Sequence, residues 1–132
     1  MGGALNGGPY LLDTSTVIWT LADPSRLSAA ARKALRAGPR VLSVVCYWEV
    51  VIKVRKGLLA ISDPVIWWSR ATDALGGSVL SIRAAHISAL VALPDLHRDP
   101  FDRMLVAQAA AEGLMLVTSD EQIRRYAVKA IW

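Results

Sequence analysis

Cysteine is nearly absent from this sequence, and apolar runs long enough to cross a membrane are missing. Cys46 is the single cysteine among 132 residues, so no internal disulfide can form. Although 54% of the residues are hydrophobic, no uninterrupted run approaches the roughly 20 residues that a bilayer-spanning helix needs. The sequence therefore predicts a cytoplasmic protein without membrane association, in which Cys46 is a buried structural thiol.

The start of the sequence also lacks the features of a targeting segment. Residues 1–9 contain four glycines and no basic stretch followed by an apolar core. We expect a flexible leader over residues 1–9 and one domain over residues 10–132. That length is sufficient to bury a single hydrophobic core without disulfides or a structural metal.

The net charge and the apolar content of the sequence both favour binding to other molecules. The 15 basic and 11 acidic residues give a net charge of +4, which favours an anionic partner such as nucleic acid without proving one. The high apolar content favours a protein partner or self-association. Because adjacent residues on a helix point in different directions, Trp67 and Trp68 favour packing or a partner interface over base stacking.

Short apolar segments alternate with helical patterns along the chain. This alternation predicts an α/β protein, a three-layer α/β/α sandwich around a central, mostly parallel sheet. The expected strands cover residues 10–12, 41–45, 79–81, 114–118 and 128–131. The expected helices cover residues 14–21, 28–35, 47–56, 64–75, 83–90 and 100–112, with a short one from residue 120.

Single acidic residues recur where the expected strands and helices meet. Asp13 and Asp120 follow two of the strands, Asp102 lies in the first turn of a helix, and Glu49 interrupts an apolar run. Because the carboxyl ends of parallel strands meet at one edge of a sheet, we expect these acids to gather there. A carboxylate at Glu49, in a largely buried helix, needs a strong partner.

Structural roles are the alternative explanation for these acids. Asp13, Asp99 and Asp120 could each cap the helix that follows. Glu49 could pair with Lys53 one turn along its helix, which stabilises an exposed helix by only about 0.2 to 0.5 kcal/mol.

A gathering of three or four carboxylates favours a bound cation, because the negative charges otherwise repel one another. Oxygen ligands without cysteine or paired histidine favour Mg²⁺ or Mn²⁺ over zinc. Such ions hold phosphate oxygens, so the pattern is typical of phosphodiester hydrolysis by a metal-activated water.

Three blocks of the sequence resemble a known family. LLDTSTVIWTL at residues 11–21, SVVCYWEVVIKVRKGLL at 43–59 and HRDPFDRMLVAQAAAEGLMLVTSDEQI at 97–123 resemble the PIN-domain ribonucleases, in particular the VapC-like toxins of type II toxin-antitoxin systems. The resemblance implies a PIN-like fold over residues 10–132 and an Mg²⁺- or Mn²⁺-dependent endoribonuclease. The partners it implies are an RNA substrate, a cognate antitoxin protein and a second copy in a homodimer.

The resemblance also implies roles for individual acids. The catalytic residues would be Asp13, Glu49, Asp102 and Asp120, with Asp13 and Asp102 as the most direct metal ligands. Glu49 would ligate metal or orient the attacking water, and Asp120 would act on metal directly or through water. Asp99 matches the family's DPFD pattern and would have an auxiliary role.

Hydroxyl groups flank the predicted site. Thr14, Ser15 and Thr118 could hydrogen-bond the carboxylates or the scissile phosphate, with ordinary helix capping as the alternative.

Basic side chains close to the acids are candidates for RNA contacts. Arg98 and Arg103 flank the acidic pair and Lys53 follows Glu49, so all three could hold RNA phosphates, with a solvated helix face as the alternative. For His97, a surface or core position is favoured over an RNA contact, and the sequence does not support a general base there.

Two other classes of protein remain open at this point. The segment DTSTV is also similar to the haloacid-dehalogenase phosphatases, in which the first aspartate is the nucleophile. However, Ser15 stands where that family usually has a second aspartate, and the chain is short for that fold. A catalytically inert PIN-like binding module is the second alternative.

Overall fold

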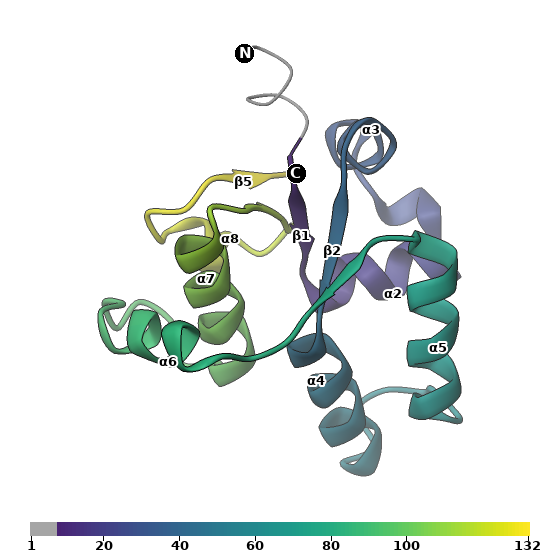
Figure 1. The fold of residues 1–132 in the computed structure, drawn as a ribbon. Coiled ribbons are helices and arrows are strands. Elements are labelled where there is room, and N and C mark those ends of the chain that lie inside the picture. The colour runs from purple at the N-terminus through teal and green to yellow at the C-terminus, as the bar shows by residue number, and fades with distance from the viewer. Residues whose placement is uncertain (1–7) are drawn as a thin grey trace.

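The computed structural model of the protein describes residues 8–132, and within this range five strands form one sheet. The strand order is β3-β2-β1-β4-β5, and every neighbouring pair is parallel (Figure 1). The strands are β1 (Tyr10–Leu12), β2 (Arg40–Ser43), β3 (Ser78–Leu80), β4 (Met115–Val117) and β5 (Ala130–Ile131). The predicted parallel sheet is confirmed.

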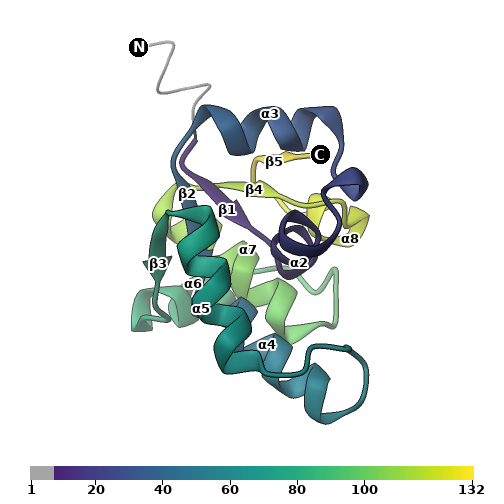
Figure 2. The same cartoon turned by 90° about the vertical axis from the view of Figure 1, so that its right-hand side faces the viewer.

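Helices cover both faces of this sheet. They are α2 (Thr14–Ala22), α3 (Ala29–Ala37), α4 (Val44–Arg55), α5 (Pro64–Leu75), α6 (Ala84–Val91), α7 (Pro100–Glu112) and α8 (Glu121–Arg124), with a 3₁₀ turn η1 (Pro24–Arg26). Helices α2, α3 and α5 lie on one face and α6, α7 and α8 on the other (Figures 1 and 2). Helix α4 follows β2 and contacts both α5 and α7.

The alternation of side chains along the strands explains why both faces are covered. In β1, Leu11 packs into the core beneath α7, whereas Tyr10 and Leu12 pack into the core beneath α2 and α3. All three side chains are buried. Successive residues of a strand point to opposite faces, so an entirely apolar strand requires apolar cover on both sides. The predicted three-layer sandwich is confirmed.

The boundary between β2 and α4 differs from the prediction. The β-branched run suggested a strand over residues 41–45, but β2 ends at Ser43 and α4 begins at Val44. The Ser43 hydroxyl accepts a hydrogen bond from the Val45 amide at 3.0 Å and so caps the helix. Cys46, in the first turn of α4, is fully buried as predicted, and burial raises the pKa of its thiol.

The predicted flexible leader lies mostly outside the described residues, which begin at Gly8. The Pro9 carbonyl accepts a hydrogen bond from the Met115 amide at 3.1 Å, next to the pairing of β1 with β4. Within residues 8–132, none of the helices combines the length and the apolar character that a membrane crossing requires.

Candidate functional site

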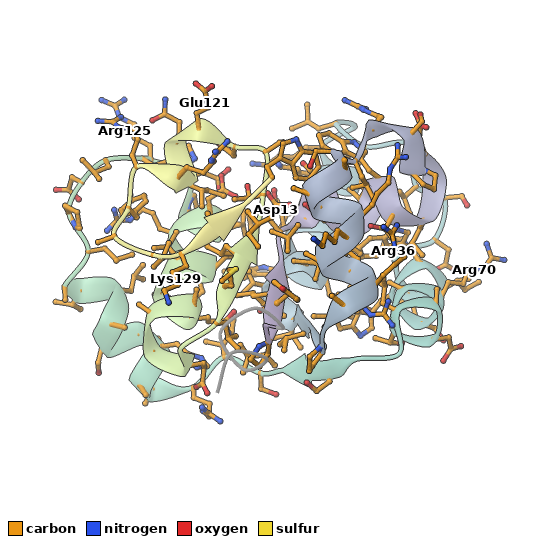
Figure 3. All side chains as sticks on the ribbon, turned by 90° about the horizontal axis from the view of Figure 1, so that it is seen from above. Asp13, Arg36, Arg70, Glu121, Arg125 and Lys129 are labelled. Atoms are coloured by element: carbon orange, nitrogen blue, oxygen red, sulfur yellow. The ribbon has the colours of Figure 1, made fainter. Side chains whose placement is uncertain are left out.

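The four predicted acids line one hollow at the carboxyl edge of the sheet. Strands β1 and β4 end side by side, and the hollow, of about 420 Å³, is lined by Asp13, Glu49, Asp102 and Asp120 together with Asp99. Its remaining lining residues are Thr14, Ser15, Lys53, His97 and Ser119. Seen from above, Asp13 lies over the middle of the molecule, whereas Arg70 and Arg125 extend outward at its margins (Figure 3).

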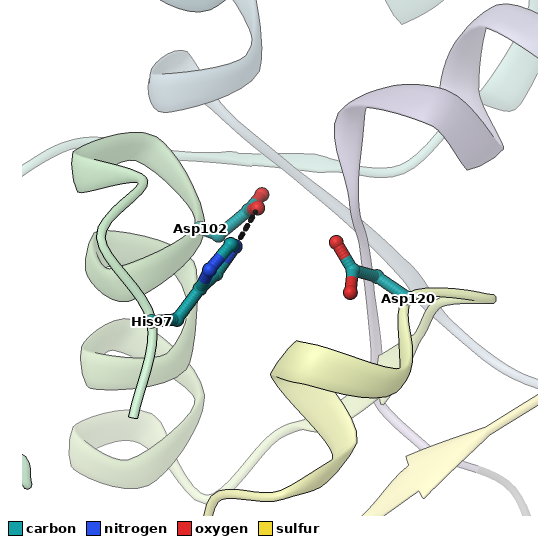
Figure 4. Close-up of side chains that lie close together, drawn as sticks. All are labelled: His97, Asp102 and Asp120. Atoms are coloured by element: carbon teal, nitrogen blue, oxygen red, sulfur yellow. Dashed lines mark hydrogen bonds and ion pairs between the residues drawn. The ribbon is translucent and has the colours of Figure 1, made fainter. Parts of the chain in front are cut away.

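Three side chains in this hollow come close enough to share one cation. Within the described part of the chain, one potential ligand atom each from His97, Asp102 and Asp120 lies within 4.8 Å of the other two (Figure 4). Asp13 and Glu49 line the same hollow but stand outside this compact group. The group therefore joins two of the predicted acids with a histidine that the sequence analysis did not assign to the site.

Asp13 is almost completely buried at the start of α2. Its Oδ1 accepts a hydrogen bond from the Thr16 amide at 2.9 Å, so Asp13 caps the helix as well as lining the hollow. Burial raises the pKa of Asp13, hydrogen bonds from Thr118 and Thr16 lower it, and the charge of Asp120 raises it, with a net rise. The carboxylate is thus placed where a nearby positive charge would stabilise its ionised form.

Glu49 has the strong partners that its burial requires. Only 3% of the residue is exposed. The Thr14 hydroxyl donates to Oε1 at 2.5 Å, and the Lys53 ammonium lies 2.5 Å from Oε2. Burial favours the neutral amine of Lys53, but the hydrogen bond and charge of Glu49 outweigh this and raise the Lys53 pKa. The pairing of Glu49 with Lys53 is therefore confirmed, and Glu49 also lines the hollow.

The ionisation of Asp102 is also strongly disturbed. Burial raises its pKa, the hydrogen bond from His97 lowers it, and the charges of Asp99, Glu49 and Asp120 raise it, which brings it to about 7. Near neutral pH this carboxyl holds a proton for much of the time. A cation in the hollow would favour the ionised form and displace that proton.

Helix capping and lining of the hollow are compatible roles for the remaining acids. Asp99 caps α7 by accepting from the amides of Phe101 and Asp102 at 2.9 and 3.0 Å. Asp120 caps α8 by accepting from the Gln122 amide at 2.7 Å. In all three bonds the acceptor is Oδ1. The cap thus uses one oxygen of each carboxylate, and Oδ2 takes no part in these capping bonds.

The three predicted hydroxyls have different surroundings. Thr14 donates to Glu49, and Thr118, fully buried, accepts a hydrogen bond from the Asp120 amide at 3.0 Å. Ser15 is exposed and lines the hollow. Thr14 and Thr118 are therefore hydrogen-bonded to groups of the site, and Ser15 is the exposed hydroxyl of the three.

Of the predicted basic contacts, only Lys53 lines the acidic hollow. Arg98 and Arg103 line a neighbouring hollow of about 700 Å³. One nitrogen of the Arg103 guanidinium, NH1, donates to the Pro94 carbonyl at 2.9 Å and to the Tyr126 hydroxyl at 3.0 Å. Arg103 is thus held by the protein itself, whereas Arg98 is exposed.

His97 is the residue that sequence reasoning missed. We favoured a surface or core position for it, but its side chain lines the acidic hollow, with Nε2 2.8 Å from Oδ2 of Asp102. The signal available was its place in the short segment leading to Asp99 and the first turn of α7. Ser119, between two site residues in the chain, also lines the hollow and was not predicted.

The donor set of the hollow fits a divalent cation. Carboxylate oxygens dominate, and Mg²⁺ and Mn²⁺ prefer such ligands. Burial and the repulsion of the neighbouring acids raise the Asp102 pKa, and a bound cation would offset both by favouring the ionised carboxylate.

Comparison with known proteins agrees with this architecture. The profile of the PIN domain family matches residues 10–129. Ribonuclease VapC22 of Mycobacterium tuberculosis (strain ATCC 25618 / H37Rv) is 30% identical over 118 residues, which cover 88% of this chain and 90% of that protein. Because the PIN match extends over nearly the whole domain, the alternative resemblance to haloacid-dehalogenase phosphatases is wrong.

Solved structures with similar folds come from toxin-antitoxin complexes. VapBC2 from Rickettsia felis, bound to a promoter DNA fragment, has a chain that aligns with a TM-score of 0.68 at 15% identity, covering 92% of this chain and 96% of that chain. A toxin-antitoxin complex from Klebsiella pneumoniae aligns with a TM-score of 0.64 at 20% identity, covering 93% and 96%. At these identities the likeness shows the fold. With the family match and the curated relative, it follows that the chain belongs to the PIN domain family, as a VapC-like member.

Proposed function

We propose that this protein is a divalent-metal-dependent endoribonuclease that acts in the cytoplasm as the toxin of a toxin-antitoxin pair. The observation that carries the proposal is the convergence of Asp13, Glu49, Asp102 and Asp120 on one hollow. A relative named as a ribonuclease and structural neighbours from toxin-antitoxin complexes support it. The gathering of these carboxylates in one hollow favours catalysis over an inert binding module.

The acids would hold Mg²⁺ or Mn²⁺, with Asp102 and Asp120 as ligands in the compact group and Asp13 and Glu49 beside them. When bound, such an ion activates water and stabilises the charge that develops on a phosphodiester during hydrolysis. Lys53 balances the charge of Glu49 and keeps that carboxylate in place.

Polar and basic groups around the hollow would bind the RNA. The exposed hydroxyl of Ser15 can donate to a phosphate oxygen at the mouth of the hollow. Arg98 and Arg103, in the adjoining hollow, would attract the phosphates on either side of the scissile bond, with Arg98 as the more accessible of the two.

An apolar groove supports the proposal of a protein partner. A hollow of about 560 Å³ between α2 and α5 is lined mostly by apolar side chains, among them Ile18, Leu21 and Trp67, together with the charged Arg70 and Asp73. Trp68 instead stacks on Tyr47, with ring centroids 5.1 Å apart. A helix or extended tail of the antitoxin would cover Trp67 in this groove, as amphipathic segments do in other complexes. We also expect a homodimer, which light scattering would test.

The decisive experiment assays RNA cleavage by the full chain, with and without its antitoxin, in Mg²⁺, in Mn²⁺ and in EDTA. We expect cleavage with either ion and none in EDTA or with the antitoxin. Asp102→Asn should reduce the rate by about 100-fold or more, since it removes a charged ligand while keeping the shape. Asp63→Asn is the matched control, because Asp63 is exposed and lines neither hollow, and asparagine can cap α5 as aspartate does. Cleavage that persists in EDTA, or in Asp102→Asn, would contradict the assignment.

A further inference from the structure

His97 reaches into the acidic hollow from the segment between α6 and α7. Its side chain is 20% exposed, and its Nε2 lies 2.8 Å from Oδ2 of Asp102. When Asp102 is ionised, as a bound cation requires, its carboxylate only accepts hydrogen bonds, so the imidazole N–H is the donor in that state. Figure 4 shows the imidazole directed at Asp102, with Asp120 facing the pair.

Two arginine side chains hydrogen-bond the backbone of the segment that leads to His97. One guanidinium nitrogen of Arg103, on α7, donates to the Pro94 carbonyl at 2.9 Å. Arg125, which follows α8, donates to the Leu96 carbonyl at 3.4 Å. Pro94 and Leu96 lie three residues and one residue before His97, so contacts from α7 and from the residue after α8 both hold the segment that leads to it. The backbone next to His97 is therefore held in place, which favours a stable contact between His97 and Asp102.

Asp102 needs such a contact if it is to face the centre of the hollow. The carboxylates of Glu49, Asp99 and Asp120 surround it, and their repulsion favours rotation of its side chain away from them. An N–H donor at the carboxylate oxygen restricts that rotation.

We propose that His97 is a positioning residue, whose imidazole N–H holds Oδ2 of Asp102 so that the carboxylate faces Asp120 across the cation site. The inference rests on the proposed function, because it assumes that Asp102 and Asp120 share a divalent ion. It assigns His97 a role outside the metal's own ligand shell. It also explains why a histidine near the mouth of the hollow is largely shielded from solvent.

Binding of Mn²⁺ to the full chain, measured by electron paramagnetic resonance, tests this role without relying on activity. We expect His97→Ala to weaken Mn²⁺ binding about 10- to 100-fold, the usual cost of losing a group that orients a metal ligand. His97→Gln keeps an N–H donor at a similar reach and should bind Mn²⁺ within about threefold of the wild type. Lys33→Ala, an exposed change on α3, controls for general effects and should leave binding unchanged.

Pulsed resonance on protein with ¹⁵N-labelled histidine separates positioning from direct ligation. We expect no coupling from a nitrogen bonded to Mn²⁺, and such a coupling would overturn the positioning role. Wild-type affinity in a folded His97→Ala variant would overturn it too, and circular dichroism establishes the folding. If the wild type cleaves RNA with bound Mn²⁺ while His97→Ala binds equally well, only the His97 inference fails. If the wild type binds no Mn²⁺, the proposed function fails with it.

Discussion

A histidine–carboxylate pair lies at each end of helix α7. The nitrogen–oxygen distance is the same in the two pairs, but the charges around them differ. At the first turn, His97 Nε2 lies 2.8 Å from Asp102, and at the last residue, His86 Nε2 lies 2.8 Å from Glu112. His86 is fully buried, whereas the His97 side chain is 20% exposed.

The charges around the two carboxylates differ in sign. Asp102 is surrounded by further acids, which together with burial raise its pKa to about 7. Glu112 has a hydrogen bond from His86 and an ion pair with Arg83, and its pKa is lowered. A short histidine–carboxylate distance therefore does not by itself identify a functional site. The charge of the neighbouring groups distinguishes the pair at the proposed cation site from the pair that joins α6 and α7.

The His86 pair belongs to a buried network that connects α6 and α7. Nδ1 of His86 accepts from the Arg83 amide at 3.0 Å and lies 3.3 Å from Nε2 of Gln108. Gln108, also fully buried, accepts a hydrogen bond from the Ser43 hydroxyl at 2.6 Å. Each of these side chains is a hydrogen-bond partner of the next, so the loss of one leaves buried polar groups unpaired.

The comparison predicts that the two histidines differ most in stability. His86→Ala should lower the free energy of unfolding by about 2 to 4 kcal/mol, because it leaves a cavity and removes the acceptor of the Arg83 amide. His97→Ala should lower it by less than about 1 kcal/mol, because that side chain is partly solvated. Urea unfolding followed by circular dichroism measures both. Equal losses would mean that the contrast between the two pairs is wrong.

The second prediction concerns pH in the absence of divalent ions. The pKa of Asp102 in the folded protein is about 7, above its ordinary value of 3.8, so the folded state binds more protons than the unfolded state between those values. Stability should therefore fall as pH rises through this window. We expect the Tm to decrease by several degrees from about pH 5 to about pH 8, and Mn²⁺ to restore it. In Asp102→Asn the Tm should decrease less over this pH range. An equal decrease in the variant would show that Asp102 is not the cause.

The smallest expected effect is at the other end of α7 and has the opposite sign. Because the pKa of Glu112 is lowered, its ionised form stabilises the folded protein, and this contribution is lost as pH falls below its ordinary value of 4.5. Glu112→Gln should slightly lower the Tm at neutral pH and leave the Tm unchanged relative to wild type in acid. Mn²⁺ affinity should be the same in wild type and Glu112→Gln. A weaker affinity in the variant would mean that the Glu112 pair influences the proposed cation site and would contradict their separation.

Much of the fold was predictable because it depends on local patterns. Entirely apolar strands require helices on both faces, and the caps at Asp13, Asp99 and Asp120 were predicted from residues that follow them directly. The boundary at Ser43 was missed because the β-branched residues after it favour a strand, while the hydroxyl that starts α4 outweighs that preference. Propensity is a weak guide where a cap competes with it.

The sequence by itself determined the order of strands and helices, and it indicated which acids meet at the carboxyl edge of the sheet. Only the tertiary structure decided how the two histidines differ, and that Arg103 braces a loop while Lys53 neutralises Glu49. The physical reason is that proton affinity and pairing depend on distances across the fold. Thr14 and Glu49 are 35 positions apart in the chain, yet their side-chain oxygens lie 2.5 Å apart in the folded protein.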